Sequence, residues 1–197
     1  MVKRYRPFPV ILSSPSGGGK STVCSILLRM DPYLRFSVTC TTRSPRPGEK
    51  NGKDYYFLSR NQFRDAVRRG SLLEWARVHG EFYGTPRKYV EDAIRKGISP
   101  VMTIDVQGAI SVKKKIPEAV SIFLLPPHRH SLHRRLIGRG ESRANIRIRL
   151  KTAKEELKNM VVYDYTVVND NLAMTTAEVL NIIAAERLKT ARRLQEV

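Results

Sequence analysis

The sequence has few cysteines and no long apolar run. Only 2 of its 197 residues are cysteines, and the spacing of Cys24 and Cys40 fits neither a metal-binding motif nor the disulfide scaffold of a short secreted protein. No apolar run approaches the ~18 residues of a membrane span. The apolar stretch at residues 10–12, after a basic start, is too short for a secretion signal. We therefore expect a soluble, cytoplasmic protein without a membrane partner.

Acidic residues are also scarce. The chain has 18 Asp and Glu against 36 Lys and Arg, which gives a formal net charge of +18. Such a surplus attracts anions, and charge alone is compatible with a nucleotide, a nucleic acid or an acidic membrane. The sequence contains neither a groove-reading motif nor a row of aromatic residues on which bases would stack. We therefore expect nucleic acid to bind only non-specifically.

The remaining composition is that of a folded globular protein, with 41% apolar and 27% charged side chains, so one continuous core is expected. Residues 10–13 are a predicted buried strand, which a glycine cluster at residues 17–19 separates from an apolar helical pattern. Similar strands are predicted at residues 101–104, 120–125 and 165–168, each before a segment compatible with a helix. This alternation indicates a parallel α/β sheet.

Three further segments surround this core. Residues 37–92 contain a turn-rich stretch, an aromatic strand, a helix opened by a capping box of Ser59 and Gln62, and a strand at residues 72–78, which together indicate an inserted mixed lobe. Residues 131–158 are helical and very basic, and the glycines within them predict a hinged lid. The C-terminal helix is expected to pack on the core through one apolar stripe: Leu180, Ile183, Ala184, Leu188 and Ala191.

A candidate phosphate loop lies between the first strand and the first helix, where residues 14–21 read Ser-Pro-Ser-Gly-Gly-Gly-Lys-Ser. Glycines let successive backbone N–H groups approach phosphate oxygens, and the helix N-terminus adds partial positive charge. Lys20 would contact the β and γ phosphates, and the Ser21 hydroxyl would bind Mg²⁺. The usual pattern begins with glycine, so the turn must form here with the side chain of Ser14 present. The expected ATP-binding residues are Ser14, Pro15, Ser16, Gly17, Gly18, Gly19, Lys20, Ser21 and Thr22.

Two arginines, Arg43 and Arg46, lie three residues apart in the turn-rich stretch, with Tyr55 close behind. Guanidinium forks suit the oxygens of a phosphate, although each residue alone also fits a solvated turn or a hydrophobic strand. The runs at residues 37–49 and 52–57 closely resemble the nucleotide-binding signature of guanylate kinases. Four shorter motifs resemble that family in the same order, so the resemblance spans nearly the whole chain: residues 73–76, 83–85, 104–108 and 168–170.

The resemblance implies a single domain with a P-loop kinase core, a parallel five-stranded sheet flanked by helices. The core would comprise residues 1–36, 93–127 and 161–197, with a mixed α/β lobe for GMP at residues 37–92 and a helical lid at residues 128–160. It implies Mg²⁺-assisted phosphoryl transfer from ATP to GMP. It is also compatible with dGMP and leaves the oligomeric state open.

The resemblance also assigns roles at the acceptor. Two arginines and two tyrosines would hold the 5′-phosphate: Arg43, Arg46, Tyr55 and Tyr83. Glu74 would face the base, because guanine offers N1–H and N2–H₂ as adjacent donors to a carboxylate, whereas adenine presents an acceptor at N1. Thr39 and Thr85 would supply hydroxyl donors where the family commonly has serine, and Asp105 would complete the base end.

The donor side and the lid follow in the same way. The resemblance gives Arg139 and Arg149 the task of stabilising charge in the transition state together with Lys20, and it places Asn169 at the edge of the donor adenine. The segment between the two lid arginines is one residue shorter than usual, which leaves Arg135 and Arg147 as alternatives.

The metal site also departs from the family pattern. Thr103 stands where an acidic residue is usual, and Asp105 is a candidate for holding Mg²⁺ through water.

One alternative function stays open at this point. A catalytically inactive guanylate-kinase-like module would grip a phosphorylated peptide with Arg43, Arg46 and Tyr55. The intact Lys20 and Ser21 argue for the enzyme instead.

Overall fold

The computed structural model describes residues 5–15, 17–138 and 143–193. Two residues with expected roles, Ser16 and Arg139, lie outside this described part of the chain. No helix within the described residues combines the length and the hydropathy that crossing a membrane requires.

The core is a five-stranded sheet in the order β2-β7-β1-β8-β9, in which every pair of neighbours is parallel. The strands span the following residues: β1 Val10–Ser13, β2 Leu34–Phe36, β7 Ser99–Thr103, β8 Val120–Leu125 and β9 Tyr165–Val168. The parallel sheet is therefore confirmed. β1, β8 and β9 have the expected bounds, and β7 begins and ends slightly earlier than expected.

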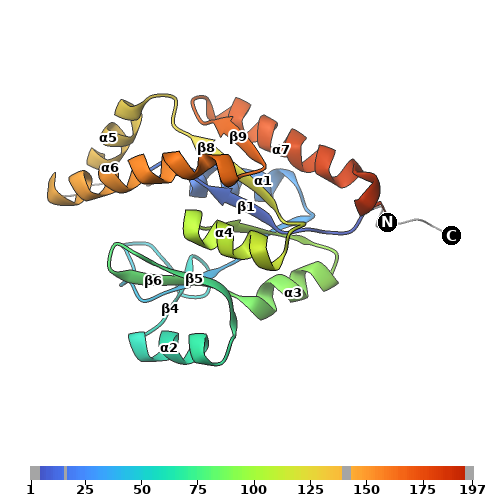
Figure 1. Cartoon of the computed structure of the whole chain (residues 1–197), viewed down its shortest axis with the longest axis horizontal. Helices are drawn as coiled ribbons and strands as arrows, with labels where there is room; N and C mark the ends of the chain where they lie inside the picture. The colour runs from blue at the N-terminus through green and yellow to red at the C-terminus, as the bar shows by residue number, and fades with distance from the viewer. Residues whose placement is uncertain (1–4, 16, 139–142, 194–197) are drawn as a thin grey trace.

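Helices cover both faces of this sheet (Figure 1). α1 (Lys20–Met30) and α7 (Leu172–Leu188) pack on one face, and α3 (Arg87–Arg95) and α4 (Val106–Lys115) pack on the other. Alternate residues of one strand enter the two cores: Val10 and Leu12 of β1 join the first cluster and Ile11 joins the second. This period of two follows from strand geometry, and burial on both faces explains why the strands read as continuous apolar runs.

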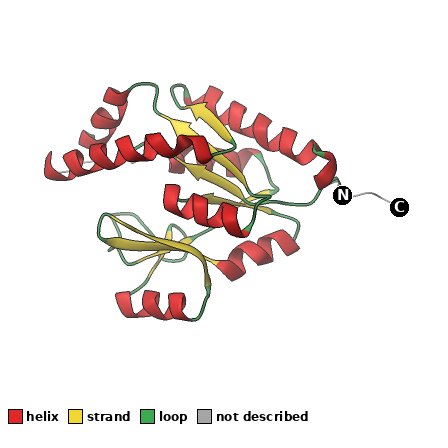
Figure 2. Cartoon of the chain, in the orientation of Figure 1, coloured by secondary structure: helices red, strands yellow, loops and turns green. Residues whose placement is uncertain are grey.

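A second, four-stranded sheet has the order β4-β3-β6-β5 and contains both parallel and antiparallel pairs (Figure 2). Its strands are β3 Thr39–Thr41, β4 Tyr55–Phe57, β5 Leu72–Val78 and β6 Glu81–Pro86, and α2 (Arg60–Arg68) accompanies them. The predicted capping box at the start of α2 is present, with Ser59 and Gln62 bonded reciprocally. The expected end of this lobe at residue 92 falls inside α3, because α3 is continuous and its Val90 packs in the core.

The expected lid segment forms two helices, α5 (Arg129–Ile137) and α6 (Arg143–Lys158), followed by a 3₁₀ turn, η1 (Asn159–Val162). α5 touches the phosphate loop, since the buried Leu136 lies beside Gly17. The segment thus contacts the phosphate loop through α5, and α6 runs back to the core, where η1 leads into β9 (Figure 1).

The expected buried stripe of the C-terminal helix was wrong in part. Leu188 is 63% exposed, Ala184 is exposed, and Ala191 lies beyond α7 in a second 3₁₀ turn, η2 (Thr190–Arg192). The buried face includes Thr176, Val179, Ile183 and Glu186. The helix therefore turns polar residues inward at both ends, which an apolar pattern alone does not detect.

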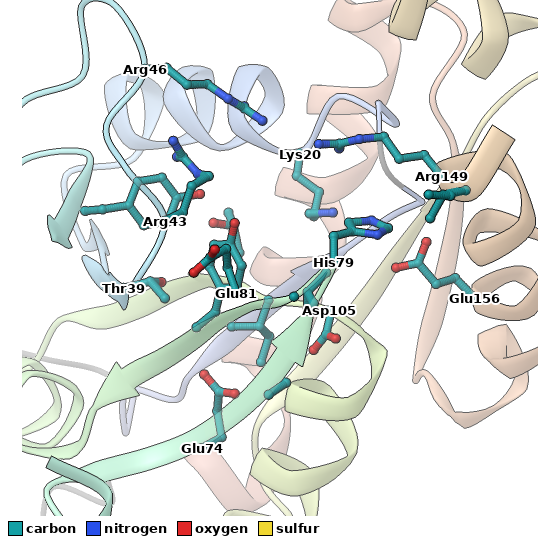
Figure 3. Close-up of a pocket in the computed structure, with 18 of the residues that line it drawn as sticks. Lys20, Thr39, Arg43, Arg46, Glu74, His79, Glu81, Asp105, Arg149 and Glu156 are labelled. Carbon is teal, nitrogen blue, oxygen red and sulfur yellow. The ribbon is translucent and has the colours of Figure 1, made fainter. Parts of the chain in front are cut away.

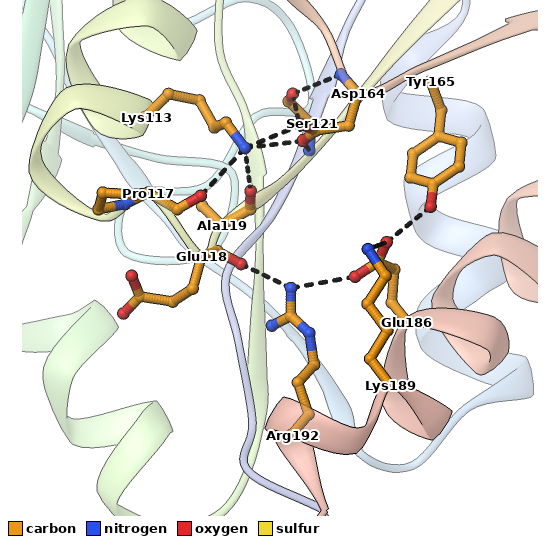
Figure 4. Close-up of polar contacts among 10 residues, drawn as sticks. All are labelled: Lys113, Pro117, Glu118, Ala119, Ser121, Asp164, Tyr165, Glu186, Lys189 and Arg192. Atoms are coloured by element: carbon orange, nitrogen blue, oxygen red, sulfur yellow. Dashed lines mark hydrogen bonds and ion pairs between the residues drawn. The ribbon is translucent and has the colours of Figure 1, made fainter.

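Polar clusters secure the ends of β8, β9 and α7 (Figure 4). Glu186 is 2% exposed, and it accepts hydrogen bonds from Tyr165 and Arg192 at 2.6 and 3.0 Å. Burial opposes its ionisation, but the hydrogen bonds from Lys189 and Tyr165 outweigh burial and lower its pKa. The buried carboxylate is thus paired as its charge requires.

Candidate active site

The phosphate loop leaves the central strand β1 and ends at the N-terminus of α1. Gly17 and Gly19 have φ values of 84° and 95°, a left-handed conformation that favours glycine. Gly19 is the N-cap of α1 and Lys20 is its first residue. The predicted strand, loop and helix context is therefore present, and the loop lies at the carboxyl edge of the sheet, where open α/β folds bind ligands.

Ser14 fits into this loop with its side chain buried. Its hydroxyl oxygen lies only 2.4 Å from the position that a Cβ on Gly18 would occupy, too close for both to be present. Lys20 Nζ donates to the Ser14 carbonyl at 2.7 Å and lies 3.3 Å from the Ser14 hydroxyl. The side chain at the first position is thus accommodated because residue 18 has none.

Asn169 lies behind the loop, at the end of β9. It is 4% exposed, and its Nδ2 donates to the Gly18 carbonyl at 2.7 Å. Arg135 of α5 donates in turn to the Asn169 carbonyl at 3.4 Å. Asn169 therefore connects the loop to the sheet edge, and its expected contact with adenine stays a prediction.

The second sheet presents a polar face opposite the loop. Register places Thr39 beside Tyr55, and Tyr83 beside Thr41. The intervening Cys40 faces the other way, into the small core of this lobe. Since side chains alternate along a strand, the four-stranded sheet separates a hydroxyl-rich face from an apolar one.

Arg43 and Arg46 lie at the rim of this face, in a turn organised by Glu49. Arg43 Nη2 pairs with Glu49 Oε1 at 2.9 Å, and the backbone N–H of Arg46 donates to Glu49 Oε2 at 2.7 Å. The Arg43 guanidinium also lies 5.3 Å from the centre of the Tyr55 ring. Glu49 thus holds the guanidinium of Arg43 and the backbone of Arg46, a role that sequence reasoning missed.

Glu74 is a buried carboxylate at the other end of the face. It is 3% exposed, and its Oε1 accepts a hydrogen bond from Thr85 Oγ1 at 2.6 Å. Burial raises its pKa to about 7, opposed by the Thr85 hydrogen bond and reinforced by the nearby charge of Asp105. Its protonation is therefore sensitive to pH near neutrality.

Asp105 lies at the end of β7 and caps α4, where its Oδ1 accepts the N–H of Gly108 at 2.9 Å. Burial raises its pKa, while the hydrogen bond from Gly108 and the charge of Lys20 act in the opposite direction. Asp105 therefore stands between the phosphate loop and Glu74.

One cavity of about 620 Å³ joins these groups. Figure 3 shows Lys20, the two arginines, Glu74 and Asp105 arranged around it. The expected residues that line it are Lys20, Thr39, Arg43, Arg46, Tyr55, Glu74, Tyr83, Asp105 and Arg149. Thr85 reaches the site through its hydrogen bond to Glu74. Lys20 and the paired guanidinium groups therefore line the same cavity. Among the described residues, the other expected ATP-binding residues are not part of its lining: Ser14, Pro15, Gly17, Gly18, Gly19, Ser21, Thr22 and Asn169.

The lid arginines differ in placement. Arg149 lines the cavity, whereas Arg147 is exposed and is not among the lining residues. Arg135 lies beside the phosphate loop, near Gly17 and Gly19. Ser21 and Thr22 are exposed in the first turn of α1.

Several lining residues were not expected from the sequence. The hairpin between β5 and β6 contributes His79, Gly80 and Glu81, and α6 contributes Asn145 and Glu156. His79 has a φ of 50°, the only positive value at a non-glycine residue in the described part of the chain. The His-Gly pair signalled a turn, but nothing local indicated that this turn reaches the cavity.

These features are those of a phosphate-loop phosphotransferase: a glycine-rich loop at a helix N-terminus, with its lysine on the same cavity as two arginines and a buried carboxylate. The sequence model described as guanylate kinase matches residues 6–186. This chain is 44% identical to the guanylate kinase of Symbiobacterium thermophilum over 93% of its own length and 87% of that protein. It is 45% identical to that of Streptococcus thermophilus over 93% and 88%.

A solved structure gives the same result. The crystal structure of guanylate kinase from Anaplasma phagocytophilum superposes with a TM-score of 0.83 at 39% identity, covering 97% of this chain and 92% of that one. The chain belongs to the guanylate kinase family.

Proposed function

We propose that this chain transfers the γ-phosphoryl group of ATP to GMP, giving ADP and GDP, with Mg²⁺ bound to the triphosphate. The observation that carries the proposal is that Lys20, Arg43 and Glu74 line one cavity. Phosphoryl transfer depends chiefly on in-line placement and on cations where charge spreads, and an acceptor phosphate is already anionic near neutral pH. No separate general base is therefore required.

ATP and GMP would bind to different residues of the site. The loop from Ser14 to Thr22 holds the triphosphate of ATP through its backbone N–H groups, with Lys20 at the β and γ phosphates. The acceptor phosphate binds Arg43, Arg46, Tyr55 and Tyr83. Burial raises the pKa of Tyr55, which keeps its hydroxyl protonated as a hydrogen-bond donor.

Base selection rests on Glu74. Ionised Glu74 accepts hydrogen bonds from guanine N1–H and N2–H₂, and Thr39, Thr85 and Asp105 complete the base end. Because the carboxylate is buried, a base that leaves it unpaired loses several hydrogen bonds at once.

The residues near the loop offer few ligands to Mg²⁺, which fits an ion whose other ligands are phosphate oxygens and water. Ser21 offers a hydroxyl in the first turn of α1, next to Lys20, and Asp105 offers a carboxylate on the cavity that Lys20 lines. Hydroxyl and carboxylate oxygens are suitable ligands for this hard cation. When bound, Mg²⁺ neutralises charge on the β and γ phosphates.

Functionally, residues 37–92 are the GMP-binding lobe, residues 128–160 are the lid, and the rest is the core. Arg149 of α6 already lines the cavity, so closing of the lid would bring its charge onto the transferred phosphoryl group. Arg139 is the second lid arginine in this proposal.

The test is ADP release by the purified chain with ATP and Mg²⁺, offering GMP, AMP, UMP and CMP in turn. We expect GMP to be strongly preferred, and Lys20→Met to lower kcat by ~10²-fold or more. Lys53→Met, which removes an exposed lysine outside the cavity, is the matched control and should leave kcat unchanged.

Two results would contradict the proposal. Equal rates with AMP and GMP would remove the role of Glu74. GMP binding without ADP release from any monophosphate would favour the inactive phosphopeptide-binding module.

A further inference from the structure

Gly108, in the first turn of α4, lies directly against the Glu74 carboxylate. A Cβ at residue 108 would lie 2.7 Å from Glu74 Oε2, 3.2 Å from its carboxyl carbon and 3.3 Å from Asp105 Oδ1. Contacts below 3.0 Å are not tolerated by a real Cβ. The missing side chain therefore leaves the space that the carboxylate fills, between α4 and β5.

The backbone does not explain this glycine. The φ of Gly108 is not positive, and the residue is an ordinary member of α4. Glycine is unfavourable within a helix compared with alanine. Space for Glu74 therefore accounts for glycine at this position better than chain conformation does.

The Glu74 carboxylate can shift away from residue 108 only by giving up its present contacts. On its other side, Oε1 is held by Thr85 at 2.6 Å, and the two residues are paired across β5 and β6. The strand itself is tied to α4, because Lys115 in the last turn of α4 donates to the carbonyl of Leu73. A methyl group at residue 108 would therefore push the carboxylate out of its position.

We propose that Gly108 is a positioning residue that determines base specificity. Because it has no side chain, the Glu74 carboxylate can pack against the first turn of α4 while it stays hydrogen-bonded to Thr85, which is the position in which it would bind guanine. This inference rests on the proposed function and deepens it. If so, the preference for GMP depends on a residue of α4, in the core, as well as on residues of the GMP-binding lobe.

The test compares Gly108→Ala with the unaltered chain and with Gln107→Ala, which changes an exposed neighbour in the same turn. For Gly108→Ala we expect the KM for GMP to rise ~10-fold or more and the preference for GMP over AMP to fall. The KM for ATP and the kcat at saturating GMP should stay within about threefold, because the phosphate loop is untouched. Gln107→Ala should resemble the unaltered chain in every value.

A double-mutant cycle shows whether the effect passes through Glu74. Adding Gly108→Ala to Glu74→Ala should change the KM for GMP by less than about twofold, since the side chain that the new methyl group displaces is already gone. A full additional loss would overturn the inference, as would a Gly108→Ala protein with unchanged GMP kinetics. Absence of GMP phosphorylation by the unaltered chain would instead overturn the proposed function.

A folding defect does not remove the test. If Gly108→Ala alone is not folded, Gly108→Ala combined with Glu74→Asp is compared with Glu74→Asp alone. Aspartate is shorter and leaves room for the methyl group at residue 108. A cooperative thermal transition in the double variant therefore supports the inference, and its absence overturns the inference.

Discussion

The side-chain amide of Asn169 donates to the carbonyl of Gly18, 151 positions earlier in the chain, at 2.7 Å. This bond joins the end of β9 to the middle of the phosphate loop and is buried. Asn169 lies outside the loop motif and near the other end of the chain, but its hydrogen bond stabilises the conformation of the loop.

Asn169→Ala should weaken ATP binding more than GMP binding. It leaves the buried Gly18 carbonyl unpaired, which costs ~1–3 kcal/mol of stability, and it frees the loop to adopt other conformations. We expect the KM for ATP to rise ~10-fold with the KM for GMP nearly unchanged. Steady-state kinetics with each substrate varied in turn measure both.

Asn171 provides the control for this prediction. Its side chain caps α7 by accepting the N–H groups of Ala173 and Met174. Asn171→Ala should lower stability by ~1 kcal/mol without changing the KM for ATP. Equal effects of the two variants on ATP would show that Asn169 matters only for stability.

GMP binding should depend on pH through Glu74. Because burial raises the pKa of Glu74 to about 7, the carboxylate is largely protonated at pH 6 and loses an acceptor for guanine. We expect the KM for GMP to rise ~10-fold from pH 8 to pH 6. In Glu74→Gln this rise should disappear except for the part due to the GMP phosphate, and an unchanged rise would contradict the assignment.

The same carboxylate should make stability fall as the pH rises from about 4.5 to about 7. The folded pKa, about 7, lies above the ordinary value of 4.5, so the unfolded chain ionises first as pH rises, and stability falls between these values. Glu74→Gln cannot ionise, so its stability relative to the unaltered chain should grow by ~2 kcal/mol from pH 5 to pH 8. Urea unfolding at both pH values measures this, and a pH-independent difference would contradict it.

Asp164 should matter for stability alone. Its carboxylate accepts hydrogen bonds from Lys113 and from the N–H and hydroxyl of Ser121, outside the cavity (Figure 4). Burial opposes ionisation, but the hydrogen bonds from Lys113 and Ser121 outweigh it and lower the pKa. Asp164→Asn should cost ~1–3 kcal/mol near neutral pH, with kcat unchanged. A loss of kcat at temperatures where the variant is fully folded would contradict this.

Local patterns predicted much of the fold. The strands at β1, β8 and β9 and the capping box of Ser59 depend on neighbouring residues, and the sequence displays them directly. The buried face of α7 was predicted poorly because Glu186 is held inside by Tyr165 and Arg192, partners that are distant from its own helical pattern.

The site divides in the same way. Lys20 follows from the loop motif, and Arg43 and Glu74 follow from the family resemblance. His79 and Gly108 act through the packing of segments far apart in sequence, whereas Glu49 contacts arginines only six and three residues before it in the same turn. A single glycine in a helix has no local signal that reveals a contact with a distant strand.

The central claim is that the two nucleotides share one cavity, so the most direct measurement uses adenosine and guanosine joined 5′ to 5′ through a phosphate chain. We predict that one such molecule binds per chain, competes with both ATP and GMP, and binds more tightly than either because the two binding events become one. If it competed with only one nucleotide, or if ATP and GMP remained bound beside it, the shared cavity would be contradicted.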